Sequence, residues 1–148
     1  MQNTPPSDKI ADVEKELRYI AGIIKQKGRK ILNNYQLTAP QFIALQFLSE
    51  YGDLTLGELS SKIHLAFSTT TDLVDRMEKN ELVERVKDSK DRRVVRIHLL
   101  EKGQRVIKEV ILKRQEYLTE VLANVPNTDI ETLSVLLHMM HDNMKKVD

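Results

Sequence analysis

The sequence predicts a mainly α-helical protein with one small β-hairpin. Only five glycines and four prolines occur in 148 residues, which indicates few turns. Apolar side chains recur at steps of three and four residues over most of the chain, whereas two short segments alternate instead. A chain of this length suits one compact domain, so we expect residues 1–148 to form a single domain.

The chain begins with two predicted helices. The first is long, because apolar residues follow one another at helical spacing from Ile10 to Ile31, interrupted only near Lys27 and Gly28. The second starts at Thr38-Ala39-Pro40-Gln41, which has the form of a capping box with proline in the first turn, and runs to about Glu50.

Two shorter helices follow. Thr55-Leu56-Gly57-Glu58 is a second capping box and opens a helix of two turns. The next helix runs from about Ser68 to Lys79 and has two different sides. Its predicted buried side contains Ala66, Thr70, Leu73, Val74 and Met77. Its polar side contains Ser68, Thr71, Asp72, Asp75 and Lys79, with Thr69 and Arg76 on a flank.

A hairpin comes next, because residues 82–87 and 94–99 alternate and are rich in β-branched side chains. The loop between them, 88–93, lacks glycine and carries three cations, so it must project into solvent. Net charge over the whole chain is only +1, yet Arg85 to Arg96 carries six basic and two acidic side chains.

Two helices complete the chain. A long one starts at Glu101 and is expected to stop at Pro126, and Thr128-Asp129-Ile130-Glu131 is expected to cap the last one. The apolar band of the last helix is too wide for one neighbour to cover, so we interpret it as an interface. Its methionines fit packing better than a cofactor site.

Several functional classes are disfavoured. The chain has no cysteine, which excludes thiolate metal sites, disulfides and thiol redox chemistry. No nucleophile elbow, phosphate-binding loop or paired-carboxylate motif occurs, so we predict neither an enzyme nor a cofactor. His138 and His141 have spacing for a metal, but we favour surface or interface histidines. With no apolar leader and no run of 18 apolar residues, we expect a cytoplasmic protein without membrane contact.

Two helices followed by a cation-tipped hairpin form a winged helix-turn-helix pattern, which suits duplex DNA. The second helix is about 18 Å long and fits a major groove about 12 Å wide. Hydroxyls of Ser68, Thr69 and Thr71 lie near its positive N-terminal end, where they can bond phosphate or a base edge. A guanidinium at the hairpin tip, from Arg92 or Arg93, can enter a minor groove.

The segments Leu73–Glu78, Leu82–Arg85, Asp88–Arg93 and Leu99–Gly103 resemble the MarR family of bacterial transcriptional regulators, over essentially the whole chain. The resemblance implies a homodimer that binds palindromic operators and is released by small phenolic or anionic effectors. Residues 54–99 would form the winged helix-turn-helix, and residues 8–34 and 101–148 the dimerisation helices. Dimer contacts would come from Ile10, Val13, Leu17, Ile130, Leu133, Leu137, Met140 and Met144.

Residue roles follow from the same resemblance. Ser68, Thr69, Thr71 and Arg76 would lie on the recognition helix. Arg93 would enter the minor groove with Asp91 beside it to orient it. Phosphate contacts would come from Arg92 and Arg96, and Lys90 is a further DNA-binding candidate.

Several positions depart from the family pattern, among them Asp72, Glu81, Leu100 and His64. Asp72 and Asp75 leave the outer face of the recognition helix without net positive charge. DNA binding is therefore expected to depend more on the hairpin of residues 82–99, which is called the wing. Glu81 replaces the usual glycine after this helix, and we expect Asn80 to take the left-handed conformation instead.

We predict a DNA-binding transcriptional regulator, a repressor rather than an activator. The alternative from another class is a protein-interaction module that uses a winged helix without specific DNA binding, and an enzyme is the third. Salt dependence of duplex binding separates the first two, because phosphate contacts weaken steeply with salt. The operator, the effector and its site stay open.

Overall fold

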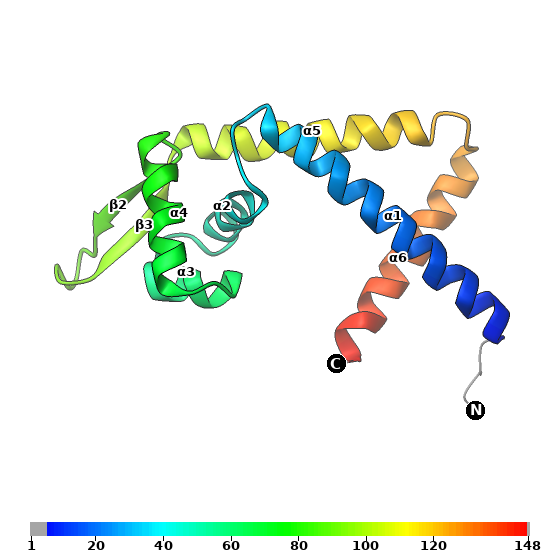
Figure 1. Cartoon of the computed structure of the whole chain (residues 1–148), viewed down its shortest axis with the longest axis horizontal. Helices are drawn as coiled ribbons and strands as arrows, with labels where there is room; N and C mark the ends of the chain where they lie inside the picture. Colours follow the sequence, from blue (N-terminus) through cyan, green and yellow to red (C-terminus); the bar gives the residue numbers. More distant parts are fainter. Residues whose placement is uncertain (1–5, 148) are drawn as a thin grey trace. The chain divides into compact units, whose positions relative to one another are not determined.

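The computed structural model describes residues 6–147 and has the predicted mainly α-helical fold with a small sheet (Figure 1). The helices are α1 (Ser7–Asn33), α2 (Ala39–Tyr51), α3 (Leu56–Ile63), α4 (Phe67–Lys79), α5 (Glu101–Val121) and α6 (Asn127–Lys146), and the strands are β1 (Leu54–Thr55), β2 (Val83–Lys87) and β3 (Val95–Leu99). No helix among these residues combines the length and apolar character needed to cross a bilayer.

Side-chain caps fix the starts of α2 and α3; the predicted capping box is complete at α2, whereas at α3 the Thr55 side chain caps the helix without the reciprocal bond from its backbone N–H to Glu58. The Gln41 amide N–H donates to Thr38 Oγ1 over 3.3 Å, and the Thr38 N–H donates to Gln41 Oε1 over 2.9 Å. At α3 the Glu58 N–H donates to Thr55 Oγ1, whose hydroxyl in turn donates to the Glu58 carboxylate. Helix α3 therefore begins at Leu56, and α4 follows it after a short turn.

The sheet has the order β1-β3-β2, and both pairings are antiparallel. The two strands of the predicted hairpin pair from Val83 opposite Leu99 to Lys87 opposite Val95. Strand β1 was not predicted: its two residues are too few to show alternation, and its pairing with β3 joins segments about 40 residues apart.

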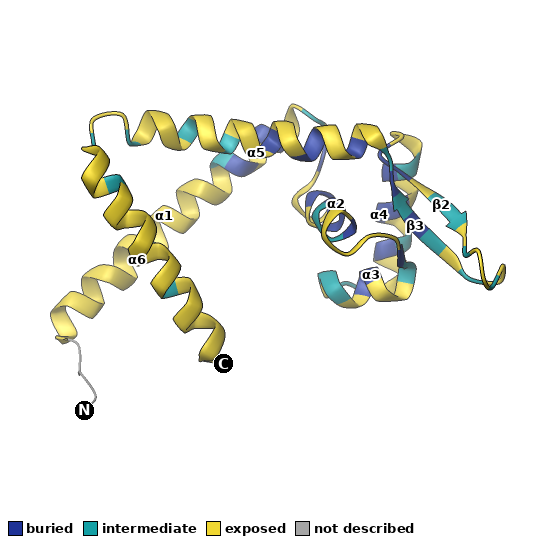
Figure 2. Cartoon of the chain, turned by 180° about the vertical axis from the view of Figure 1, so that it is seen from behind, coloured by how far each residue is buried: buried dark blue, intermediate teal, exposed yellow. Residues whose placement is uncertain are grey.

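The chain divides into two compact units, and the boundary falls after Ile111, inside α5. The first unit contains the hydrophobic core, which α2, α3, α4, the sheet and the first half of α5 build together. Its fully enclosed side chains include Phe42, Leu45, Leu59, Met77 and Ile97. Dark blue residues accordingly gather on these elements in Figure 2.

Gly103 allows the start of α5 to approach the turn between α4 and β2. A Cβ at this position would lie 2.5 Å from the Leu82 carbonyl oxygen and 2.6 Å from Leu99 Cδ1. Nearby, the Leu100 N–H donates to the same Leu82 carbonyl. Only glycine fits this contact without a shift of the backbone.

The end of α4 corrects one expectation. Asn80 keeps a negative φ of −87°, and Glu81 itself takes the left-handed conformation with φ of 62°. The Leu82 N–H then donates to the Met77 carbonyl and the Glu81 N–H to that of Glu78, as in a Schellman motif. Leu82 is buried, so hydrophobic packing of the following residue fixes which residue turns left-handed.

The second unit contains the end of α5 and the whole of α6. Two boundary expectations were wrong here: α5 ends at Val121 rather than continuing to Pro126, and α6 begins at Asn127 with Pro126 as its N-cap residue. No side chain caps α6, so the predicted cap at Thr128 is absent. None of the described residues of α6 is buried.

Candidate nucleic-acid interface

Helix α4 presents the predicted polar side to solvent. Thr70, Leu73, Val74 and Met77 are buried, whereas Ala66, expected on the same side, is exposed because it precedes the helix as its N-cap residue. The Thr70 hydroxyl donates to the Ala66 carbonyl over 3.0 Å, which satisfies this buried polar group.

The hydroxyls at the start of α4 differ in availability. Ser68 and Thr69 are exposed, and within residues 6–147 their hydroxyls have no hydrogen-bond partner. The Thr71 hydroxyl is half-buried and donates to the Phe67 carbonyl, which leaves its oxygen free to accept. Since no side chain caps this first turn, its backbone N–H groups also face outward.

A carboxylate, rather than a glycine, shapes the tip of the hairpin. Asp88 accepts hydrogen bonds from the backbone N–H groups of Lys90 and Asp91 over 3.0 and 2.9 Å. The Asp88 N–H donates to the Val94 carbonyl and closes the turn. This explains how a loop without glycine can support a cationic tip.

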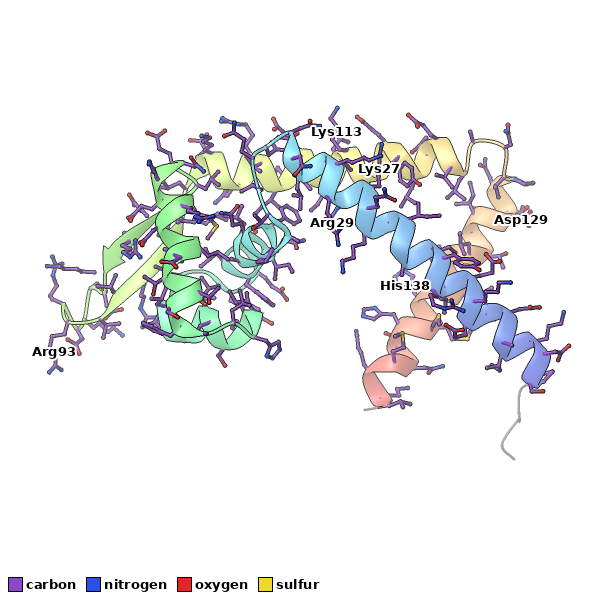
Figure 3. The ribbon with its side chains drawn as sticks, viewed as in Figure 1. Lys27, Arg29, Arg93, Lys113, Asp129 and His138 are labelled. Atoms are coloured by element: carbon purple, nitrogen blue, oxygen red, sulfur yellow. The ribbon has the colours of Figure 1, made fainter. Side chains whose placement is uncertain are left out.

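Arg93 and Asp91 form a two-point ion pair at this tip. Arg93 Nε lies 3.0 Å from Asp91 Oδ1, and its Nη2 lies 3.0 Å from Oδ2. The hydrogen bonds from the Arg93 side chain and backbone hold the pKa of Asp91 below its ordinary value. The guanidinium side chain is 90% exposed, and Figure 3 shows Arg93 at the outer end of the hairpin.

Arg96 lies on β3 close to the hairpin loop, opposite Val86. Its Nε lies 2.9 Å from the Asp88 carboxylate and its Nη1 lies 3.5 Å from that of Glu58 in α3. The hydrogen bond from Arg96 is the largest of the causes that lower the pKa of Asp88. The side chain assigned to a phosphate contact thus already bridges the hairpin and α3.

Arg85 makes the corresponding bridge to α4, although no spacing in the sequence singles it out. Its Nη1 lies 2.6 Å from the Glu78 carboxylate and its Nη2 lies 2.7 Å from that of Asp75. The Arg85 N–H also donates to Glu78. These partners lie seven and ten residues apart across a turn, so no helical spacing could have revealed them.

Comparison with known proteins agrees with this geometry. The MarR family model matches residues 37–95. A transcriptional regulator of Bacillus subtilis named YsmB and described as uncharacterized is 59% identical over 141 residues, 95% of this chain and 97% of its own length. The chain belongs to the MarR family. It is therefore a transcriptional regulator with a helix-turn-helix DNA-binding fold and not an enzyme.

Two further relatives extend the comparison. A MarR-family protein of Bacillus stearothermophilus with a solved structure is 54% identical, with a TM-score of 0.85 over 96% of this chain and 99% of that one. The repressor MdtR of Bacillus subtilis is 25% identical over 77% of this chain and 74% of its own length. The fold and its order of elements are thus shared along nearly the whole chain.

The residues assigned to dimerisation in this MarR-family chain lie on exposed apolar faces. In α1, Ile10 and Val13 are each 49% exposed and Leu17 is half-buried. Five apolar side chains of α6 line a groove of about 560 Å³ in the second unit: Ile130, Leu133, Leu137, Met140 and Met144. His138 and His141 also line this groove, and no cluster of three possible metal ligands occurs among the described residues.

Proposed function

We propose that this chain acts in the bacterial cytoplasm as a homodimeric, ligand-responsive repressor that binds a palindromic operator. Two recognition helices, one from each subunit, would enter successive major grooves about 34 Å apart. A repressor fits this arrangement, because a dimer bound near a promoter competes with polymerase for the same DNA. The relative MdtR is described as a repressor, which supports repression rather than activation by this chain.

The observation that carries the DNA-binding part is the joint exposure of two polar surfaces. Helix α4 presents Ser68, Thr69, Thr71 and Arg76 to solvent or at its edge, and the wing presents Lys90, Arg92 and Arg93. Hydroxyls and N–H groups at the start of a helix suit phosphate and base edges, and guanidinium groups suit a narrow minor groove. In this proposal Asp91 holds Arg93 in its extended orientation.

Arg96 has a second role in this proposal. Its guanidinium has more donors than its two carboxylate partners occupy, so one N–H group can contact a phosphate while the bridge to Asp88 and Glu58 persists. Arg96 would therefore couple the position of the wing to the DNA backbone.

The dimeric part rests on α1 and α6. Large apolar side chains on both helices are 40 to 65% exposed, including Ile20, Leu133, Leu137 and Met144. Exposed apolar helix faces of this kind mark protein interfaces, and a second copy supplies matching faces by symmetry. An effector would favour a dimer conformation whose recognition helices are wrongly spaced for the operator. To do so, it must bind this conformation more tightly than the DNA-binding one.

Salt-dependent binding of labelled duplex to the full chain tests the proposal. An operator first selected from random duplexes should be an inverted repeat with half-sites one helical turn apart or a multiple of it. With 6 to 10 phosphate contacts, affinity should fall by about 10³ to 10⁵ between 50 and 200 mM salt. Weak, salt-insensitive binding without sequence preference would instead support the protein-interaction module.

A further inference from the structure

Asp72 is a carboxylate in the middle of the surface that would face DNA. At 100° per residue it lies about 150° around α4 from the centre of the buried side, close to the direction of Ser68 and Lys79. Its side chain is exposed and lines a pocket of about 310 Å³ together with Thr69 and Arg76.

Four other carboxylates of α4 and the hairpin are engaged with arginines. Asp75 and Glu78 bind Arg85, Asp88 binds Arg96, and Asp91 binds Arg93. Within residues 6–147, Asp72 has neither an ion-pair nor a side-chain hydrogen-bond partner. Arg76, one helical turn further on, is likewise free of carboxylates there, so both groups are available to an external ligand.

A free carboxylate at this position is repelled by DNA phosphates unless a base donates a hydrogen bond to it. In the major groove only cytosine N4 and adenine N6 present amine donors. Adenine also places its N7 acceptor beside that amine, which repels the second carboxylate oxygen, whereas cytosine places a C–H group there. The chemistry therefore favours cytosine.

We propose that Asp72 is a specificity-determining residue that accepts a hydrogen bond from the N4 amine of a cytosine in each half-site. Arg76 carries the complementary donors for O6 and N7 of the guanine in the same base pair. Neighbouring side chains on one helix face would thus read both strands of one C·G pair. The inference rests on the proposed entry of α4 into the major groove.

The test uses the full chain and an operator selected with the wild type from random duplexes. Replacing the critical cytosine by pyrimidin-2-one, which lacks the N4 amine, should weaken wild-type binding about five- to hundredfold. The same replacement should not affect D72A, which has no acceptor to lose. D72N should change the preferred base at that pair from cytosine to adenine, since asparagine pairs with adenine N6 and N7.

D75N is the matched control, because it removes the same charge from the same helix at a carboxylate already bound to Arg85. It should leave the base preference unchanged, and circular dichroism should show all variants folded. If the wild type selects an operator but D72N selects the same one, the role of Asp72 is wrong while DNA binding stands. If the wild type retains no duplex at all, the proposed function fails with it.

Discussion

Helices α4 and α6 are both amphipathic, but α4 buries its apolar face and α6 does not. Helix α4 buries Thr70, Leu73, Val74 and Met77 in the core of its own unit. Helix α6 is longer and buries no residue, although it carries a full apolar band. The first unit, which ends at Ile111 and is called the winged unit below, thus buries its own apolar side chains, whereas the apolar face of α6 is left exposed.

The largest expected effect comes from charging that face. In the proposed dimer, Leu137→Asp places an unpaired carboxylate in the interface, which costs about 3–5 kcal/mol. We expect a monomer by sedimentation velocity at micromolar concentration, and at least about a hundredfold loss of operator affinity. Asn143→Asp adds the same charge to the same helix away from the groove residues and should leave the dimer intact. A dimeric Leu137→Asp protein would place the interface elsewhere.

Removing methyl groups from the core of the winged unit should have the next largest effect. Leu45 is fully enclosed, so Leu45→Ala should lower the free energy of unfolding by about 2–5 kcal/mol in urea titrations. Leu137, which is 50% exposed, offers the matched substitution in α6. Leu137→Ala should act mainly through the dimer, so its effect should grow on dilution. Equal, concentration-independent losses would contradict the contrast between the two regions.

The sequence predicts those features of the fold that depend on residues close together in the chain, and it misses those that depend on packing between distant segments. Thr38 and Gln41 lie three residues apart, so the sequence predicts their capping box, and the structure confirms it. The left-handed residue after α4 was assigned to Asn80 because asparagine tolerates that conformation, but burial of Leu82 moves it to Glu81. At this position the packing of a buried side chain outweighs the local preference of asparagine for the left-handed conformation.

The candidate site shows the same limit. The cationic tip is visible in the sequence because Lys90, Arg92 and Arg93 are close together. The bridge from Arg96 to Glu58 spans 38 residues, and that from Arg85 to Asp75 crosses a turn, so neither has a sequence signature. Sequence therefore identifies which cations are present. The structure separates the two that carboxylates of α3 and α4 hold against these helices, Arg85 and Arg96, from those in the exposed loop.

Truncating the wing tip should have an intermediate effect confined to DNA binding. Arg93→Ala should weaken operator binding by about 1–3 kcal/mol, a value typical of one specific contact. It should hardly change stability, because its ion pair with Asp91 is exposed. Arg92→Ala is the comparison: a lost phosphate contact should weaken all sequences alike and lower the salt slope by about 1. Unchanged affinity of Arg93→Ala would remove this residue from the interface.

The smallest expected effect is a gain in stability at the end of α4. Glu81 holds a left-handed conformation with φ of 62°, which costs a non-glycine residue about 1–2 kcal/mol. Glu81→Gly relieves this strain but increases the entropy of the unfolded chain, so thermal or urea unfolding should show a net gain of about 1 kcal/mol. Glu84→Gln, at a nearby strand position with negative φ, controls for the lost charge. Because this turn contains none of the residues proposed for the dimer interface, the gain should leave the dimer dissociation constant unchanged. A gain that appears only in the dimer would show that the two regions fold as one cooperative body.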